Sequence, residues 1–132
     1  MALDPQFLTL AEVLYFHQYQ IKRFGGDEGL RDEGLLESAI AQPRAAFGGH
    51  WLHPTLYDMA AAYAFHICKN HPFLDGNKRT SLASALVFLD TNGISLNDPD
   101  DRLPEAIESI AIGKINKAQF ADLLRELTEA KS

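Results

Sequence analysis

The sequence predicts an all-α fold in which two buried central helices flank a polar loop. Apolar residues recur at helical spacing in six segments, and no alternating period of two persists long enough to require a sheet. Glycine and proline fall between these segments, and no internal repeat or linker divides the chain. We therefore expect one compact domain over residues 1–132, with Met1 to Gln6 either disordered or left over from cloning.

The first two helices are marked by their ends. A helix is expected from Leu10 to Phe24, because Thr9 and Glu12 form a capping box at its start and a glycine pair follows it. A shorter helix from about Glu33 to Gln42 ends before a proline. The segment Pro43–His53, rich in glycine and aromatic residues, is expected to be a loop that could contain a short hairpin.

The remaining helices include the two central ones. Residues 54–70 carry apolar side chains on several faces and predict a largely buried helix, which breaks at His71 because proline follows. A second central helix is expected from about Lys78 to Thr91, before an Asn-Gly pair. Amphipathic helices over Pro104–Gly113 and Lys117–Glu129 complete the expected bundle.

Charge and cysteine content limit the function classes. A formal net charge of −6 and a pI near 5.2 argue against nucleic acid or anionic membrane as partners, which select for clustered lysine and arginine. The single cysteine, Cys68, lies in an apolar stretch and predicts a buried thiol in a reducing compartment. The longest apolar run, Leu82 to Leu89, is too short to span a bilayer, and the first residues do not resemble a secretory signal. We expect a cytoplasmic protein.

The stretch from His71 to Thr80 is the candidate for chemistry, since polar residues between two buried helices cost desolvation. The helix that begins there offers free backbone N–H groups and its positive dipole end, and Gly76 allows an anion to approach the backbone closely. Lys78 and Arg79 add positive charge that is unfavourable for the helix start itself. An anionic ligand would resolve that conflict.

Two side chains in this stretch favour phosphate chemistry over simple anion binding. Asp75 suits a magnesium ion that bridges a carboxylate and phosphate oxygens. His71, just outside a helix, can accept a proton near neutral pH.

Other interpretations of these residues remain open. Taken singly, residues such as His71, Asp75 and Asn77 are more often helix caps or turn residues. Lys78 and Arg79 could likewise belong to a solvent-exposed helix face. A histidine four residues before a carboxylate is also typical of a metal-hydrolase fragment, although no second histidine pair or carboxylate cluster completes such a site.

The string His71-Pro72-Phe73-Leu74-Asp75-Gly76-Asn77-Lys78-Arg79 closely resembles the Fic signature, His-x-Phe-x-Asp/Glu-Gly-Asn followed by Gly-Arg-x-x-Arg. It departs at Lys78, where adenylylating Fic enzymes have glycine, and at Leu82, where they have a second arginine. Both departures are similar to the Doc (death-on-curing) branch of the Fic/Doc superfamily.

This resemblance implies a six-helix Fic/Doc-type bundle and an enzyme that transfers the γ-phosphoryl group of ATP to a protein hydroxyl. His71 would be the general base and Asp75 would hold Mg²⁺. The nucleotide-binding residues would be Asp75, Gly76, Asn77, Lys78 and Arg79, with the Asn77 side chain and the Gly76 backbone on phosphate oxygens.

The resemblance also implies a toxin of a toxin–antitoxin system. Its target would be a threonine of elongation factor Tu, and its restraint an antitoxin of the prevents-host-death type, because the internal inhibitory string of many Fic proteins is absent. The segment Ala45–His53 matches a flap that aligns the target, although Trp51 could equally pack on the core. Two other functions stay open: adenylyl transfer, and a catalytically silent binding module.

Overall fold

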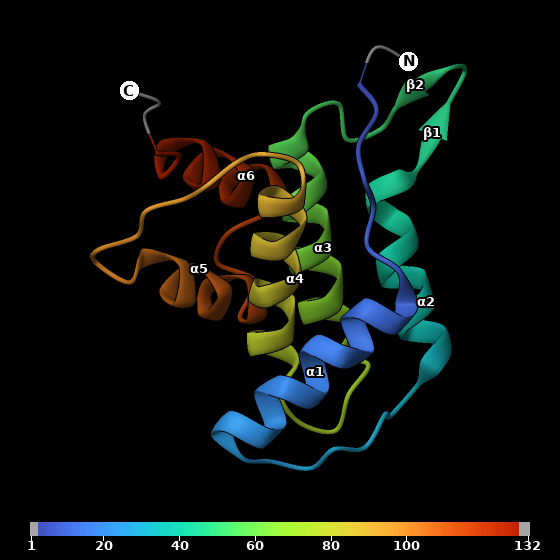
Figure 1. Ribbon diagram of the computed structural model, residues 1–132, viewed down its shortest axis with the longest axis vertical. Helices are drawn as coiled ribbons and strands as arrows, with labels where there is room; N and C mark the ends of the chain where they lie inside the picture. Colours follow the sequence, from blue (N-terminus) through green and yellow to red (C-terminus); the bar gives the residue numbers. More distant parts are fainter. Residues whose placement is uncertain (1–2, 130–132) are drawn as a thin grey trace.

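The computed structural model describes residues 3–129 and confirms the all-α prediction (Figure 1). Within this range the α-helices are α1 (Leu10–Phe24), α2 (Glu33–Ala41), α3 (Leu56–Asn70), α4 (Asn77–Thr91), α5 (Arg102–Ala111) and α6 (Lys117–Glu126). A single turn of 3₁₀-helix, η1 (Gln42–Arg44), extends α2. Strands β1 (Ala46–Phe47) and β2 (His50–Trp51) form the small hairpin anticipated in the loop between α2 and α3.

Helix α3 is the centre of the bundle. It packs against α4 along its length and against α2, α5 and α6 on its other sides, as Figure 1 shows. Four alanines, at positions 60, 61, 62 and 64, are fully buried, and their small side chains let these neighbours approach closely. The loop between α3 and α4, which holds the candidate residues, is therefore carried between the two best-packed helices.

The helix boundaries differ from the sequence prediction by one to three residues at six ends: the starts of α3, α4 and α5 and the ends of α2, α5 and α6. Helix α5 begins two residues before Pro104, because the Asp98 carboxylate accepts hydrogen bonds of 2.8 Å from the backbone N–H groups of Arg102 and Leu103. Helix α4 begins at Asn77, one residue earlier than expected. Helix α6 ends at Glu126, because the following residues pair with the chain around Ser95–Asn97 instead.

The N-terminal segment is held against the bundle from residue 3 onward. The carbonyl of Leu3 accepts a hydrogen bond from the Trp51 indole, and Gln6 exchanges hydrogen bonds with the side chain of Asn92. The disorder anticipated for residues 1–6 therefore does not extend to residues 3–6, and residues 1–2 lie outside the described range.

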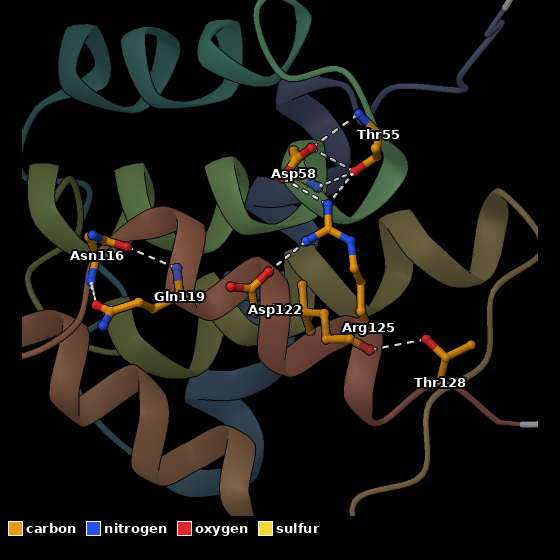
Figure 2. A network of polar contacts seen from close by, with 8 residues as sticks. Thr55, Asp58, Asn116, Gln119, Asp122, Arg125 and Thr128 are labelled. Atoms are coloured by element: carbon orange, nitrogen blue, oxygen red, sulfur yellow. Dashed lines mark hydrogen bonds and ion pairs between the residues drawn. The ribbon is translucent and has the colours of Figure 1, made fainter.

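Helix α6 is tied to the start of α3 by Arg125 (Figure 2). Its guanidinium donates to Thr55 Oγ1 at 3.0 Å and pairs with Asp58 at 3.2 Å and with Asp122 at 2.9 Å. Because Thr55 and Asp58 form the capping box of α3, this network joins the C-terminal helix to the central one.

The structure bears on two compositional expectations. Cys68 is buried, as expected, and burial raises the pKa of its thiol. Among residues 3–129, no helix combines the length and the apolar character that crossing a bilayer requires.

Candidate active site

The polar loop between α3 and α4 opens into a cavity of about 670 Å³. The walls come from the end of α1, from the first ten residues of α4, from the middle of α5 and from the loop itself. The lining residues are Gln20, Phe24, His71, Leu74, Asp75, Gly76, Asn77, Lys78, Arg79, Leu82, Ala83, Leu86, Pro104, Ile107 and Glu108. All six residues predicted from the sequence thus lie around one cavity, polar at the loop and apolar along α4 and α5.

His71 ends helix α3 in the left-handed conformation, with φ 50° and ψ 55°. The following proline disfavours the helical region at this position, and the His71 N–H still donates to the carbonyl of Ile67 at 3.2 Å. The residue is exposed, so its imidazole can meet a solvent-borne substrate. A non-glycine residue with this backbone is uncommon and is a feature of functional sites.

Gly76 begins helix α4 with φ 78°, a left-handed conformation that glycine adopts without penalty. No side chain caps this helix, in contrast to α1, α2, α3 and α6. The backbone N–H groups of its first turn therefore remain available to an anion, together with the positive end of the helix dipole.

The Asn77 side chain holds the loop together. Its Oδ1 accepts from the N–H of Phe73 and its Nδ2 donates to the carbonyl of Phe73, both at 2.9 Å, and the residue is buried. The expected side-chain contact to phosphate stays a prediction, since the Nδ2 group carries two N–H donors and the Phe73 carbonyl takes one of them. In this structure Asn77 shapes the anion site and offers its backbone N–H.

Asp75 faces the cavity with a supported carboxylate. Its Oδ2 accepts from the backbone N–H of Asp27 at 2.8 Å, and its carbonyl oxygen is 2.8 Å from Nε2 of His17. The His17 ring, buried in α1, also stacks on Phe73 with ring centroids 3.7 Å apart. Helix α1 therefore fixes the end of the loop that leads into α4.

The two cations at the start of α4 have partners on different helices. Lys78 pairs with Glu108 of α5 at 2.8 Å, in an exposed ion pair that contributes little stability. The Arg79 guanidinium lies 4.3 Å from the ring centroid of Phe24, at the end of α1. That aromatic ring is half exposed and holds the guanidinium at the cavity wall by a cation–π contact.

Other residues weighed in the sequence lie elsewhere. Trp51 packs its ring edge-on against Phe7 with centroids 5.4 Å apart, so the core interpretation of this residue is confirmed. His66 lies 3.0 Å from the ammonium group of Lys117 on α6 and has no contact with His71. Burial, reinforced by the Lys117 charge, lowers the pKa of His66 to about 4.

Several residues that position or line the site were not assigned to it from the sequence, among them His17, Phe24, Arg31 and Glu108. One of them left a signal, since His17 shares the spacing of the buried positions Val13 and Ile21 on α1. Phe24 and Arg31 stand in stretches that resemble the family pattern, Phe24-Gly25-Gly26 and Leu30-Arg31-Asp32, but the resemblance assigned them no role at the site. Glu108 left no signal, because exposed charged residues on helices are common.

Comparison with known proteins agrees with this geometry. Residues 7–89 match the Fic/DOC family. The chain is 47% identical over 73 residues to Toxin Doc of Mycolicibacterium smegmatis, covering 55% of this chain and 56% of that protein. It is 34% identical over 116 residues to Protein kinase doc of Escherichia phage P1, covering 88% of this chain and 90% of the phage protein. The matched segment thus spans only about half of the mycobacterial toxin.

Proposed function

Because this chain belongs to the Fic/DOC family, we propose that it transfers the γ-phosphoryl group of ATP to a hydroxyl group of a target protein. One observation carries the proposal: an exposed histidine, His71, and an uncapped helix N-terminus flanked by Lys78 and Arg79 line the same cavity. The name of the phage relative, Protein kinase doc, supports phosphoryl transfer.

In this proposal the chain's own residues accept a proton and hold phosphate. His71 takes the proton of the attacking hydroxyl, as a general base does. The N–H groups of the first turn of α4 receive phosphate oxygens, and Arg79, held against Phe24, donates to another phosphate. Such positioning and charge neutralisation are the main demands of phosphoryl transfer.

A magnesium ion fits the residues present. Mg²⁺ in nucleotide sites is commonly held by one or two carboxylates together with substrate phosphates. Asp75 supplies one such carboxylate, whose Oδ2 is fixed by Asp27, and residues 3–129 contain no larger cluster of metal-ligating side chains. The ion would neutralise charge on the phosphates of the bound nucleotide.

The walls next to the anion site support γ-phosphoryl rather than adenylyl transfer. Leu82 lines the cavity where an adenylylating relative is expected to have a phosphate-binding arginine. Lys78 stands at the start of α4, where adenylylating relatives are expected to have glycine, and is paired with Glu108. The site thus offers one arginine and one lysine in place of two arginines and a glycine.

We further propose that the protein is a toxin of a toxin–antitoxin system that inhibits translation in the cytoplasm, with a threonine of elongation factor Tu as its target. The names of both relatives support a toxin with kinase activity. Its antitoxin would be of the prevents-host-death type. The apolar part of the cavity, formed by Leu82, Leu86 and Ile107, offers a groove near the site for such a partner.

The test is a mass measurement on the target. The protein is incubated with Mg²⁺, ATP and purified elongation factor Tu, and the intact mass of the factor is read, with His71→Ala and Asp75→Asn run in parallel. A gain of one phosphoryl group that both variants lose supports the proposal. A gain of an adenylyl group contradicts the γ-phosphoryl assignment, and no gain with the wild-type protein contradicts the target.

A further inference from the structure

The segment Asp27–Asp32, between α1 and α2, runs along the loop that carries the candidate site. The Asp27 N–H donates to the Asp75 carboxylate, and the Gly29 carbonyl accepts from the N–H of Leu74 at 2.9 Å. Leu30 and Phe73 form an isolated antiparallel bridge. The segment therefore supports the loop along its length.

Arg31 holds the other end of that loop. Its Nε donates to the carbonyl of His71 at 2.8 Å, and its Nη2 donates to the carbonyl of Asn70 at 3.0 Å. The backbone N–H groups of Arg31 and Asp32 both donate to the carbonyl of Pro72, at 2.7 and 3.0 Å. Three successive carbonyls at the end of α3 are thus bound by two neighbouring residues.

These bonds are made to carbonyl groups at the end of α3, where helical partners are absent. The last carbonyls of a helix have no partner within the helix, and arginine side chains can satisfy them. His71 is also one of the two non-glycine residues with positive φ in residues 3–129, a conformation that persists only when its surroundings fix it. A planar guanidinium that binds the carbonyls on both sides of the turn fixes the orientation of its peptide groups.

Arg31 does so without touching the ligand space. It does not line the cavity, and its bonds are to backbone atoms alone. A side chain in this position can alter the direction in which the imidazole points while leaving the phosphate-binding N–H groups of α4 in place.

We propose that Arg31 is a positioning residue for His71. Through its bonds to the carbonyls of Asn70 and His71, the Arg31 guanidinium sets the backbone conformation of the general base. The inference rests on the proposed function for its kinetic consequence, although the conformational effect can be measured without it. It predicts a loss in the chemical step with little loss in nucleotide binding.

The kinetic test compares Arg31→Ala, Arg31→Lys and a control, Arg102→Ala, whose arginine pairs with Glu126 away from the site. We expect Arg31→Ala to lower kcat on the order of 10- to 100-fold, because small displacements of a reacting group have effects of this size. The KM for ATP should change by less than about threefold, since ground-state contacts to phosphate remain. Arg31→Lys, which keeps the charge but cannot bind both carbonyls in a planar fork, should recover part of the rate, and Arg102→Ala should match the wild type.

A second readout separates this inference from the proposed function. The Cα chemical shift of His71 reports its backbone conformation, and its ring-proton shifts report the surroundings of the imidazole, whether or not the substrate is correct. In Arg31→Ala these signals should shift or broaden while the signals of the core helices stay in place. If the wild type modifies no target, the proposed function fails and the NMR comparison alone decides the inference.

Three results would overturn the proposal. An Arg31→Ala protein with wild-type kcat would show that the base needs no such support. Full recovery by Arg31→Lys would assign the effect to charge and not to the paired hydrogen bonds. Unchanged His71 signals in a folded Arg31→Ala or Arg31→Lys protein would show that the conformation is set elsewhere.

Discussion

Acidification should destabilise this protein through His66, and Lys117→Met should weaken that effect. His66 on α3 lies against Lys117 on α6, and His53 and Asp58 are the other titratable groups that act on this cluster. The pKa of His66 is lowered to about 4 from an ordinary value of 6.5. Burial is the largest cause, the Lys117 charge comes second and His53 third. Burial also lowers the pKa of His53, which adds in the same direction.

The sign and size follow from linkage. Between pH 6.5 and pH 4 the unfolded chain binds a proton at His66 that the folded chain does not, so the free energy of unfolding falls as pH falls through this window. The full difference in pKa corresponds to about 3.4 kcal/mol. Because the ring is only partly buried and water screens it, we expect about half of this, roughly 1.5 kcal/mol.

Two measurements are made. The pKa of the His66 ring is determined by NMR titration, and the free energy of unfolding is measured at pH 7 and pH 4.5 by urea unfolding monitored by circular dichroism. Lys117→Met should raise the pKa of His66 toward its ordinary value and reduce the loss of stability on acidification. Lys114→Met, which removes an exposed lysine from the preceding turn, is the matched control and should leave both unchanged. A wild-type ring that titrates near pH 6.5 would refute the reasoning.

Two further substitutions test a contact to the site loop and a buried hydrogen bond in the core. Gly26→Ala should lower the free energy of unfolding by about 1–3 kcal/mol and weaken ATP binding, because its φ of 119° strains any side chain and its new Cβ would lie 3.1 Å from the Asp75 Cβ. Gly25→Ala, strained at φ 85° but facing open space, should keep wild-type ATP affinity, and equal losses in both would contradict the contact argument. Tyr63→Phe removes the hydroxyl that accepts from the Leu8 N–H and should cost about 1–3 kcal/mol in urea unfolding. Unchanged stability would mean that this buried N–H finds another acceptor.

Much of the fold could be predicted because its signals are local. The capping box of Thr9 and Glu12 placed the start of α1 at the residue where the structure has it, and His71 before proline placed the end of α3. The misplaced ends depend on distant partners. Helix α6 is shorter than its apolar pattern suggests, because Leu127 and Glu129 bond to the chain near Ser95.

The candidate site divides in the same way. The residues of the polar loop are contiguous, so their grouping around one anion site followed from the sequence. The two hydrogen bonds that the Asn77 amide makes to the backbone of Phe73 did not follow from the sequence. An asparagine that bonds to the nearby backbone and one that faces solvent look alike in a sequence, and only the folded geometry distinguishes them.

By itself, the sequence determined six helices and the position of an anion-binding loop between the two central ones. It could do so because helical periodicity, helix caps and the residues from His71 to Arg79 are each contained in a short stretch of chain. Tertiary structure alone decided what supports that loop. Arg31 reaches His71 across 40 positions, and His17 reaches Asp75 across 58. Such pairs form only when α1 and the segment after it pack against the end of α3, and a single sequence carries no signal for a contact whose two residues are brought together by the packing of other elements.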